Sequence, residues 1–333
     1  MISVEHLSKK YGDFLAVDDL SFEIEDGHIY GFLGPNGAGK STTLNIMTGC
    51  LAATEGTVTI DGHDIFEDER EAKKLIGYLP EMPPLYVEQT PREYLEFVAE
   101  AKGVSKADRP AEIAKVIEET HIEDMADKLI KHLSKGYRQR VGIAQALLGN
   151  PSVIILDEPT VGLDPMQIIE IRDLIEELGK KHTVILSSHI LSEVQAICEK
   201  VLIIYKGKLV AFDEPENLSR SLSAGNTIEL VAEAEQDQII ATLDSVESIT
   251  KTELKSYEEG RARVLVYTAE DDPLECCRSI YRAFKNSEGD LLMLNPVNTT
   301  LEDIFIELTS ADENGQLENF DLSEDESEKE DNQ

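Results

Sequence analysis

A glycine-rich stretch, GPNGAGKSTT at residues 34–43, constrains the fold of this 333-residue chain more than any other feature. It follows HIYGFL (28–33), an apolar run of strand length, and it matches the pattern G-x-x-x-x-G-K-[ST]. Glycine permits a backbone whose N–H groups point into one concavity, and a helix that starts there adds unpaired N–H groups and partial positive charge. We therefore expect a strand, a loop and a helix that together bind a nucleoside triphosphate. The alternative is a glycine-rich turn that matches by chance.

Roles within this loop follow from the same chemistry. Lys40 is expected to reach the β- and γ-phosphates, and the Ser41 hydroxyl is expected to ligate Mg²⁺. The surrounding backbone offers N–H groups to the phosphates without Cβ clashes. The predicted nucleotide-binding residues of the loop are Gly34, Pro35, Asn36, Gly37, Ala38, Gly39, Lys40, Ser41 and Thr42.

The stretch VIILDEPT at residues 153–160 carries a second signal. Its four apolar residues predict a buried strand that ends in Asp157 and Glu158, and ligands bind at the carboxyl ends of parallel strands. Asp157 is expected to hold Mg²⁺ through water. Glu158 is expected to orient or deprotonate the attacking water. A solvated acidic turn is the alternative interpretation.

The arrangement of apolar segments predicts an α/β fold. Residues 1–65 are rich in short β-type runs separated by Gly and Asp turns, and helical spacing dominates from Asp68 to Asn150. Beyond them, SVIILDEPT, HTVILSSH and KVLIIYKGKLV are continuous apolar runs with helical segments between them. Continuous apolar strands separated by helices indicate a mostly parallel sheet that is covered on both faces.

The pattern changes after the polar stretch ENLSRSLSAGN. We expect a first domain at residues 1–220 and a small C-terminal α+β domain, of ferredoxin-like arrangement, at residues 221–310. TTLEDIFIELT predicts a final amphipathic helix, with Thr299 as N-cap and Glu302 at the capping-box position. Residues 311–333 contain ten acidic residues and one lysine, which predicts a disordered, solvating tail.

Charge and cysteine content narrow the classes of partner. The formal net charge of −35 argues against nucleic-acid binding, because phosphate contacts need clustered Lys and Arg. The four cysteines lack metal-ligand spacing, which predicts free thiols in a reducing cytosol. No run approaches the roughly 18 apolar residues of a membrane span, so any role at a membrane is expected to go through a partner protein.

Two longer segments, LSKGYRQRVGIAQALLGNPSVIILDEPTVGLDP and ILSSHILSEV, resemble the ATP-binding cassette (ABC) ATPases in their order and spacing. The resemblance covers about residues 2–220. It implies a P-loop ABC cassette, in which a mostly parallel core sheet carries an antiparallel β subdomain and a helical subdomain, here at about residues 85–150. It also implies that the chain binds ATP with Mg²⁺ and hydrolyses it to ADP and phosphate.

The resemblance assigns roles to two further loops. Ser134 and Gly136 lie in the signature motif, and they are expected to cap the γ-phosphate that the opposite subunit holds. Asp164 belongs, with Gly162 and Leu163, to the loop that crosses the dimer interface and contributes to the nucleotide site. The first of these loops is expected to begin a helix, whose N-terminus favours an anion.

Three more positions match the family outside those loops. His189 matches the switch histidine that contacts the γ-phosphate, and we count it with Glu158 as a catalytic residue. Tyr11 matches the aromatic residue that stacks on adenine, with Val17 nearby. Because stacking on a base contributes about 1–3 kcal/mol of affinity in nucleic-acid systems, Tyr11 is expected to support binding rather than chemistry.

The chain departs from the family pattern at three positions. Lys135 replaces a glycine of the signature motif, and Tyr137 replaces its glutamine. In IGYLPEMPPLY, Glu81 stands where the family has glutamine after proline. Such changes resemble those of the ABC-2 type exporter ATPases, a bacterial branch that also carries a helix like LEDIFIELT. We expect Glu81 to act beside the nucleotide and Mg²⁺ and in coupling, while Glu158 remains the base.

The resemblance as a whole implies the motor subunit of a bacterial ABC-2 type exporter at the cytoplasmic face of the cell membrane. A separately encoded transmembrane permease would carry the cargo, and the cassette would form a homodimer, or pair with a second ATPase subunit, on binding ATP. Drugs, peptides, lipids and ions all stay open as cargo. A soluble ABC ATPase acting on ribosomes or DNA is disfavoured, because the chain has one cassette, no long coiled-coil insertion and no basic patch. A regulatory module without turnover is disfavoured because Glu158 and His189 are both present.

Overall fold

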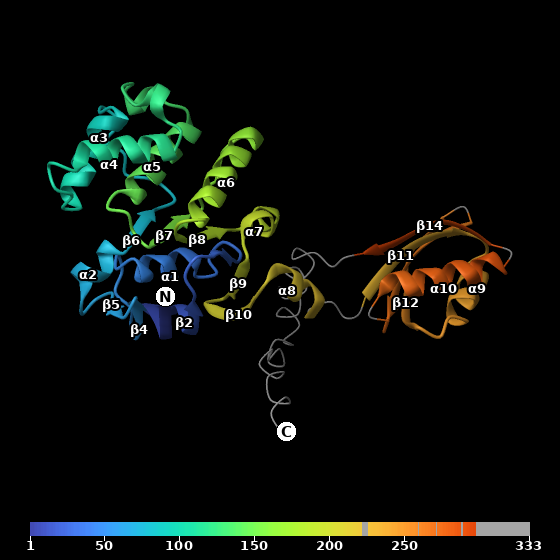
Figure 1. Cartoon of the computed structure of the whole chain (residues 1–333). Helices are drawn as coiled ribbons and strands as arrows, with labels where there is room; N and C mark the ends of the chain where they lie inside the picture. The colour runs from blue at the N-terminus through green and yellow to red at the C-terminus, as the bar shows by residue number, and fades with distance from the viewer. Residues whose placement is uncertain (222–225, 259, 271, 288, 298–333) are drawn as a thin grey trace, which may run out of the picture. The chain divides into compact units, whose positions relative to one another are not determined.

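The chain divides into two compact units, Met1–Pro215 and Glu216–Gln333 (Figure 1). The sequence placed this boundary after residue 220. The predicted helix TTLEDIFIELT and the acidic segment 311–333 lie outside the described residues. The computed structural model describes residues 1–221, 226–258, 260–270, 272–287 and 289–297.

The core of the first unit is a six-stranded sheet with strand order β10-β9-β3-β8-β7-β6. All neighbouring strands are parallel except β9 and β10, which form an antiparallel hairpin. Every residue of β3 and β7 is buried, and the predicted parallel sheet with two covered faces is confirmed. The strands are β3 (Ile29–Leu33), β6 (Ile76–Leu79), β7 (Val153–Asp157), β8 (Thr183–Ser188), β9 (Lys200–Tyr205) and β10 (Lys208–Asp213).

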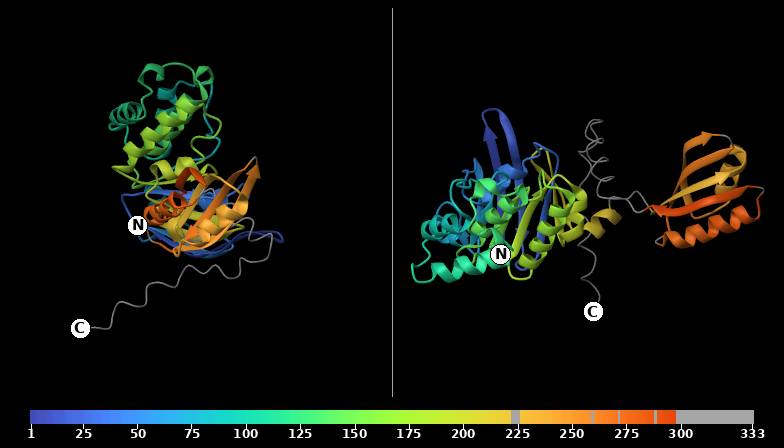
Figure 2. Two further views of the ribbon diagram at one scale, coloured as in Figure 1. Left: turned by 90° about the vertical axis from the view of Figure 1, so that its right-hand side faces the viewer. Right: turned by 90° about the horizontal axis from the view of Figure 1, so that it is seen from above.

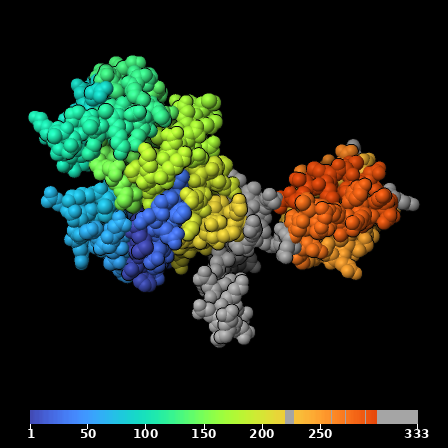
Figure 3. Space-filling view, in the orientation of Figure 1, coloured from blue at the N-terminus to red at the C-terminus, as the bar shows by residue number. Residues whose placement is uncertain are grey.

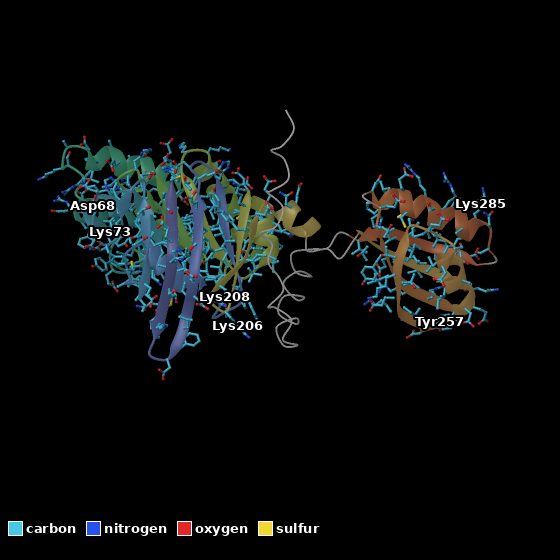
Figure 4. The ribbon with its side chains drawn as sticks, turned by 90° about the horizontal axis from the view of Figure 1, so that it is seen from below. Asp68, Lys73, Lys206, Lys208, Tyr257 and Lys285 are labelled. Carbon is cyan, nitrogen blue, oxygen red and sulfur yellow. The ribbon has the colours of Figure 1, made fainter. Side chains whose placement is uncertain are left out.

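Helices cover this sheet along its width. Helix α1 (Lys40–Met47) contacts β7, α6 (Pro165–Gly179) and α7 (Leu191–Ile197) lie against β8, and α5 (Lys135–Leu147) packs on β6 and β7. Helix α7 also packs very closely on the central strand β3. The Lys206–Lys208 turn between β9 and β10 lies at the opposite edge of the sheet from β6 (Figure 4).

A second, antiparallel sheet of four strands has the order β2-β1-β4-β5. Its apolar side shares one hydrophobic core with the six-stranded sheet, and the Phe22 and Phe32 rings meet edge to face with centroids 5.6 Å apart. The long β1–β2 hairpin extends past its neighbours (Figure 2). The strands are β1 (Ile2–Tyr11), β2 (Phe14–Ile24), β4 (Glu55–Ile60) and β5 (His63–Asp64).

A helical lobe is inserted between the adjacent strands β6 and β7 (Figure 1). In the space-filling view its green surface projects from the rest of the first unit (Figure 3). Thr90 and Glu93 form a capping box at its first helix, which begins with Pro91, so several start signals agree. The stretch 68–150, where helical spacing dominates, also contains the strand β6. This strand has only four residues, too few to show a periodic pattern in the sequence. The helices of this region are α2 (Glu69–Lys74), α3 (Pro91–Ala101), α4 (Arg109–Glu119), the 3-10 turns η1 (Glu123–Met125) and η2 (Ile130–His132), and α5 (Lys135–Leu147).

The second unit is a four-stranded antiparallel sheet with order β12-β13-β11-β14. The chain order strand–helix–strand–strand–helix–strand with this strand order is the ferredoxin-like arrangement expected. Helices α9 and α10 pack on the sheet around a separate apolar core, and Figure 4 marks Tyr257 on β12 and Lys285 at the end of α10. The elements are α8 (Pro215–Ser221), β11 (Asn226–Glu233), α9 (Gln236–Asp244), β12 (Ile249–Glu258), β13 (Arg261–Thr268), α10 (Pro273–Lys285) and β14 (Asp290–Val297).

Two further expectations can be compared with the structure. All four cysteines, Cys50, Cys198, Cys276 and Cys277, are free thiols. Among the described residues, no helix combines the length and the apolar character needed to cross a membrane. The last two cysteines are buried in the core of the second unit, where they pack as small apolar side chains.

Candidate nucleotide-binding and hydrolysis site

Most of the predicted site residues surround one cavity of about 530 Å³ in the first unit. It lies beside the carboxyl ends of β3, β7 and β8, where the loops that follow these strands meet. Phe14, Ala16 and Val161 line it too, although the sequence did not single them out as ligand contacts. The predicted residues that line it are Tyr11, Pro35, Asn36, Gly37, Gly39, Lys40, Ser41, Thr42, Glu81, Glu158 and His189.

The phosphate loop, residues 34–39, is held by close backbone contacts. Gly39 has φ +109°, and a side chain there would place its Cβ 2.6 Å from the Ala16 carbonyl oxygen. Only glycine therefore fits at this position. From behind, Gly207 in the β9–β10 turn donates its N–H to the Ala38 carbonyl at 2.8 Å. A neighbouring hairpin thus supports the loop, and in the part of the chain that the structure describes the first N–H groups of α1 have no acceptor and can bind a ligand.

Lys40 bends back over the phosphate loop. Its Nζ donates hydrogen bonds to the carbonyl oxygens of Gly34 at 2.8 Å and Pro35 at 3.3 Å. The same ammonium lies 3.6 Å from Glu158 Oε1, and only 5% of the Lys40 side chain is exposed. The loop therefore carries a buried cation next to free backbone donors, which is an environment suited to a polyphosphate.

Ser41 lines the cavity and contacts Asp157, which does not itself line it. We call this the metal side of the cavity, because the sequence predicts Mg²⁺ at these two residues. The Ser41 hydroxyl donates to Asp157 Oδ1 at 3.1 Å, and the Ser187 hydroxyl donates to the same oxygen at 2.6 Å. Burial raises the pKa of the Asp157 carboxyl, the two hydroxyl hydrogen bonds oppose this rise, and the nearby negative charge of Glu158 adds to it. Sequence reasoning missed Ser187. A polar residue in the otherwise apolar run of β8 was the available signal.

Glu158 lies between two basic side chains. Its Oε2 is 2.8 Å from His189 Nδ1, opposite the Oε1 that faces Lys40. Its backbone has φ +50°, which is unfavourable for a side chain of this size, and its N–H donates to the Ser187 hydroxyl at 2.9 Å. Strained backbone of this kind clusters at functional sites. The arrangement can orient a water molecule and accept its proton.

Two exposed aromatic rings border the other end of the cavity. Tyr11 and Phe14 pair across the β1–β2 turn, with 48% and 63% of each residue exposed. Such exposed rings at both ends of the YGDF turn offer flat surfaces for a base. Val17, predicted beside Tyr11, is fully buried in the core of the unit and does not line the cavity.

Glu81 lies on the loop after β6 and is exposed at the cavity wall. It forms no hydrogen bond or ion pair with any described residue. The same holds for its loop neighbour Met82, which is 84% exposed. Glu81 is thus free to turn toward a ligand in the cavity or toward another protein.

The predicted residues Ser134, Gly136 and Asp164 do not line this cavity. Ser134 caps α5 by accepting a hydrogen bond from the Tyr137 N–H at 3.3 Å, and Asp164 caps α6 by accepting one from the Gln167 N–H at 3.0 Å. The two helix starts are in contact, because a Cβ on Gly136 would lie 2.9 Å from Gln167 Cδ. The structure therefore joins these three predicted residues to one another but not to the phosphate loop.

Lys135 connects this signature turn to the loop after Glu158. Its Nζ donates to the Val161 carbonyl at 2.6 Å. Gly162 follows with φ +67°, and a Cβ there would lie 2.3 Å from the Lys135 Nζ. This tether within one chain was not predicted, because it needs the tertiary distance between two loops far apart in sequence.

A phosphate loop after β3 that opens a helix, an acidic pair at the end of β7 in the same parallel sheet, and a helical lobe inserted between β6 and β7 define a P-loop nucleoside triphosphatase. Residues 17–161 match the family model described as "ABC transporter". The chain belongs to the ATP-binding subunits of ABC transporters.

Individual relatives agree with this assignment. The bacitracin transport ATP-binding protein BcrA of Bacillus licheniformis is 34% identical over 92% of this chain and 97% of its own length. The linearmycin resistance ATP-binding protein LnrL of Bacillus subtilis is 29% identical over 93% of this chain and 98% of its own. Among solved structures, the cassette MJ0796, a dimer in a post-hydrolysis state with ADP and Pi, superposes with TM-score 0.58 and 28% identity over 64% of this chain and 98% of its own.

The predicted fold class, family and ATPase activity are thereby confirmed. The chain binds and hydrolyses ATP, and it is the motor subunit of an ABC transporter of exporter type that drives a membrane permease.

Proposed function

We propose that two cassettes, either two copies of this chain or this chain with a second ATPase subunit, hold two MgATP molecules between them. The observation that carries this proposal is that Ser134 and Gly136 do not line the phosphate cavity of their own chain. The start of α5 favours an anion, and the capping hydroxyl of Ser134 can still donate its own hydrogen, so a second cassette would bring its cavity to this helix start. Asp164 would then lie at the joint between the subunits.

Magnesium fits the donor set at the metal side of the cavity. The Ser41 hydroxyl and the Asp157 carboxylate are hard oxygen donors held 3.1 Å apart, and Mg²⁺ prefers such oxygens. Mg²⁺ supplies neutralisation of the charge that develops on the β- and γ-phosphates. Glu81 would reach this side of the cavity from the loop after β6, because Leu79 at the end of β6 pairs with Leu156 of β7.

Each protein group then has a defined task in hydrolysis. Lys40 leaves its contacts with the loop carbonyls and pairs with the phosphates, while Tyr11 stacks on adenine. Glu158 orients the attacking water and accepts its proton, and His189 holds Glu158 and the γ-phosphate in register. Closure of the second cassette over the cavity excludes water and completes the site.

The subunit's membrane partner is proposed from its membership in the family of ABC transporter ATP-binding subunits. The transporter would combine this subunit, bound at the cytoplasmic face of the membrane, with a separately encoded permease of the ABC-2 type. Purification of the tagged chain from solubilised membranes, followed by identification of the co-purifying polypeptide, tests this part. Recovery of the chain without any multi-span membrane protein would contradict it.

Glu158→Gln is the test of the dimer and of the base. The amide keeps the size of the carboxylate but cannot take the proton, so we expect ATP binding without turnover and a trapped dimer. Size-exclusion chromatography with and without MgATP measures the trapping, and Lys40→Ala/Glu158→Gln is the matched control that should stay monomeric. A Glu158→Gln protein that stays monomeric and hydrolyses ATP normally would contradict the proposal.

A further inference from the structure

Glu193 is a buried carboxylate that the proposed mechanism does not use. It lies in the first turn of α7, and only 6% of the residue is exposed. In the part of the chain that the structure describes, no lysine, arginine or histidine pairs with it. Because an isolated buried carboxylate is costly, its hydrogen bonds must hold it in place.

These hydrogen bonds connect two separate segments through one oxygen atom. The Thr160 hydroxyl donates to Glu193 Oε2 at 2.5 Å, and the Ser188 hydroxyl donates to the same oxygen at 3.2 Å. The Ser188 oxygen in turn accepts the Ile190 N–H at 3.0 Å, so this hydroxyl is held on both sides. Bonds to an ionised acceptor are the stronger kind.

The two segments are those that carry the reacting pair. Thr160 is two residues after Glu158, and Ser188 is directly before His189. The side chains of Glu158 and His189 then meet at 2.8 Å. The contacts form a closed ring. Glu193 fixes the distance between the backbone after Glu158 and the backbone before His189, and the Glu158–His189 contact closes the ring.

We propose that Glu193 is a positioning residue for ATP hydrolysis, which holds the Glu158 and His189 segments at their working distance without touching nucleotide. The inference rests on the proposed role of Glu158 as base. The backbone of Glu158 is in an unfavourable conformation, so it needs support on both sides. Ser187 supports its N–H, and Glu193, through Thr160, supports the chain that follows.

Removal of this carboxylate should slow the chemical step while leaving ATP binding unchanged. In Glu193→Ala, we expect kcat to fall about tenfold to a hundredfold, the range that a small misplacement of reacting groups produces. The KM for ATP should stay within about twofold, because the phosphate loop and Tyr11 do not contact Glu193. Glu193→Gln should retain more activity, because its amide oxygen still accepts the Thr160 hydroxyl.

Thr160→Val tests the same contact from the other side and serves if Glu193→Ala does not fold. It should lower kcat in the same way, Thr160→Ser should restore it, and the double variant Thr160→Val/Glu193→Ala should be no slower than Glu193→Ala. Gln195→Ala, on the exposed side of α7, is the matched control.

The outcomes separate this inference from the proposed function. Normal turnover in Glu158→Gln would overturn the proposed function itself. Loss of turnover in Glu158→Gln together with wild-type kcat in Glu193→Ala and Thr160→Val would overturn only the role of Glu193. Equal losses in Glu193→Gln and Glu193→Ala, with losses that add in the double variant, would also overturn it.

Discussion

At the scale of single residues, the ammonium of Lys40 decides whether the cavity can hold a polyphosphate. Lys40→Ala should abolish MgATP binding, because the loop loses its matched cation while the phosphates keep their negative charge. Titration calorimetry with MgATP measures the loss. Lys73→Ala, which removes an exposed lysine paired with Glu69, is the control and should bind normally. Near-normal affinity of Lys40→Ala for MgATP would contradict the assignment of this cavity as the nucleotide site.

Glu81 is the second residue at which a single group can be tested. A carboxylate has the reach of the amide found in related proteins, but it only accepts hydrogen bonds when ionised and it carries a charge. Glu81→Gln should therefore retain most basal ATPase activity, whereas Glu81→Ala should impair stimulation by the permease more than basal turnover. ATPase rates against pH, for Glu81→Gln and Glu158→Gln side by side, measure this. A dead Glu81 variant beside an active Glu158 variant would reverse the two assignments.

How much of this site the sequence predicts depends on how far apart the interacting residues lie. The loop around Lys40 and the acidic pair after β7 are local patterns, so their chemistry follows from residue types and spacing. The Lys135–Val161 tether and the contacts of Glu193 join segments that meet only in the folded chain, and no local pattern marks them. Val17 shows that a match to the family pattern can also mislead. Its position near Tyr11 predicted a contact with the nucleotide, but its side chain is fully buried.

At the scale of elements, the packing of α7 on β3 determines where Glu193 lies relative to the site. Gly31 in β3 has no room for a side chain, since a Cβ there would lie 2.4 Å from Val194 Cγ1 and 3.0 Å from Cys198 Sγ. The helix therefore rests directly on the sheet and places Glu193 beside Thr160. The apolar runs of β7 and β8 could be recognised in the sequence, whereas this close contact joins Gly31 and Val194, which lie far apart in the chain.

Gly31→Ala tests this packing. Pushing α7 away from the sheet should destabilise the unit by about 1–3 kcal/mol, which is typical of overpacking. Thermal unfolding measures it as a lower midpoint. Gly31→Ala/Val194→Ala should recover part of the loss, because the second change removes the atom that clashes. A single variant as stable as wild type would mean that the helix can shift freely.

At the scale of the whole molecule, the acidic segment at the C-terminus carries none of the chemistry found in the first unit. Deletion of residues 312–333 should leave ATPase activity intact, since every group assigned to binding and hydrolysis lies before residue 194. Steady-state ATPase assays and circular dichroism on the shortened chain measure activity and fold. A large loss of activity with the fold preserved would make the segment regulatory.

The central strand β3 pairs with β8 on one side and β9 on the other, and both come far later in the chain. On the ribosome, β3 therefore has both neighbours complete only after residue 205 has emerged, at the end of β9. At usual rates of synthesis this interval is about 10 to 30 s. During this interval the apolar strand β3 lacks at least one of its partner strands. Exposed apolar segments of this kind are what chaperones bind, so we expect chaperone binding to the nascent chain in this interval. The strand that leads into the phosphate loop is thus made early but reaches its full pairing only once β8 and β9 have been made.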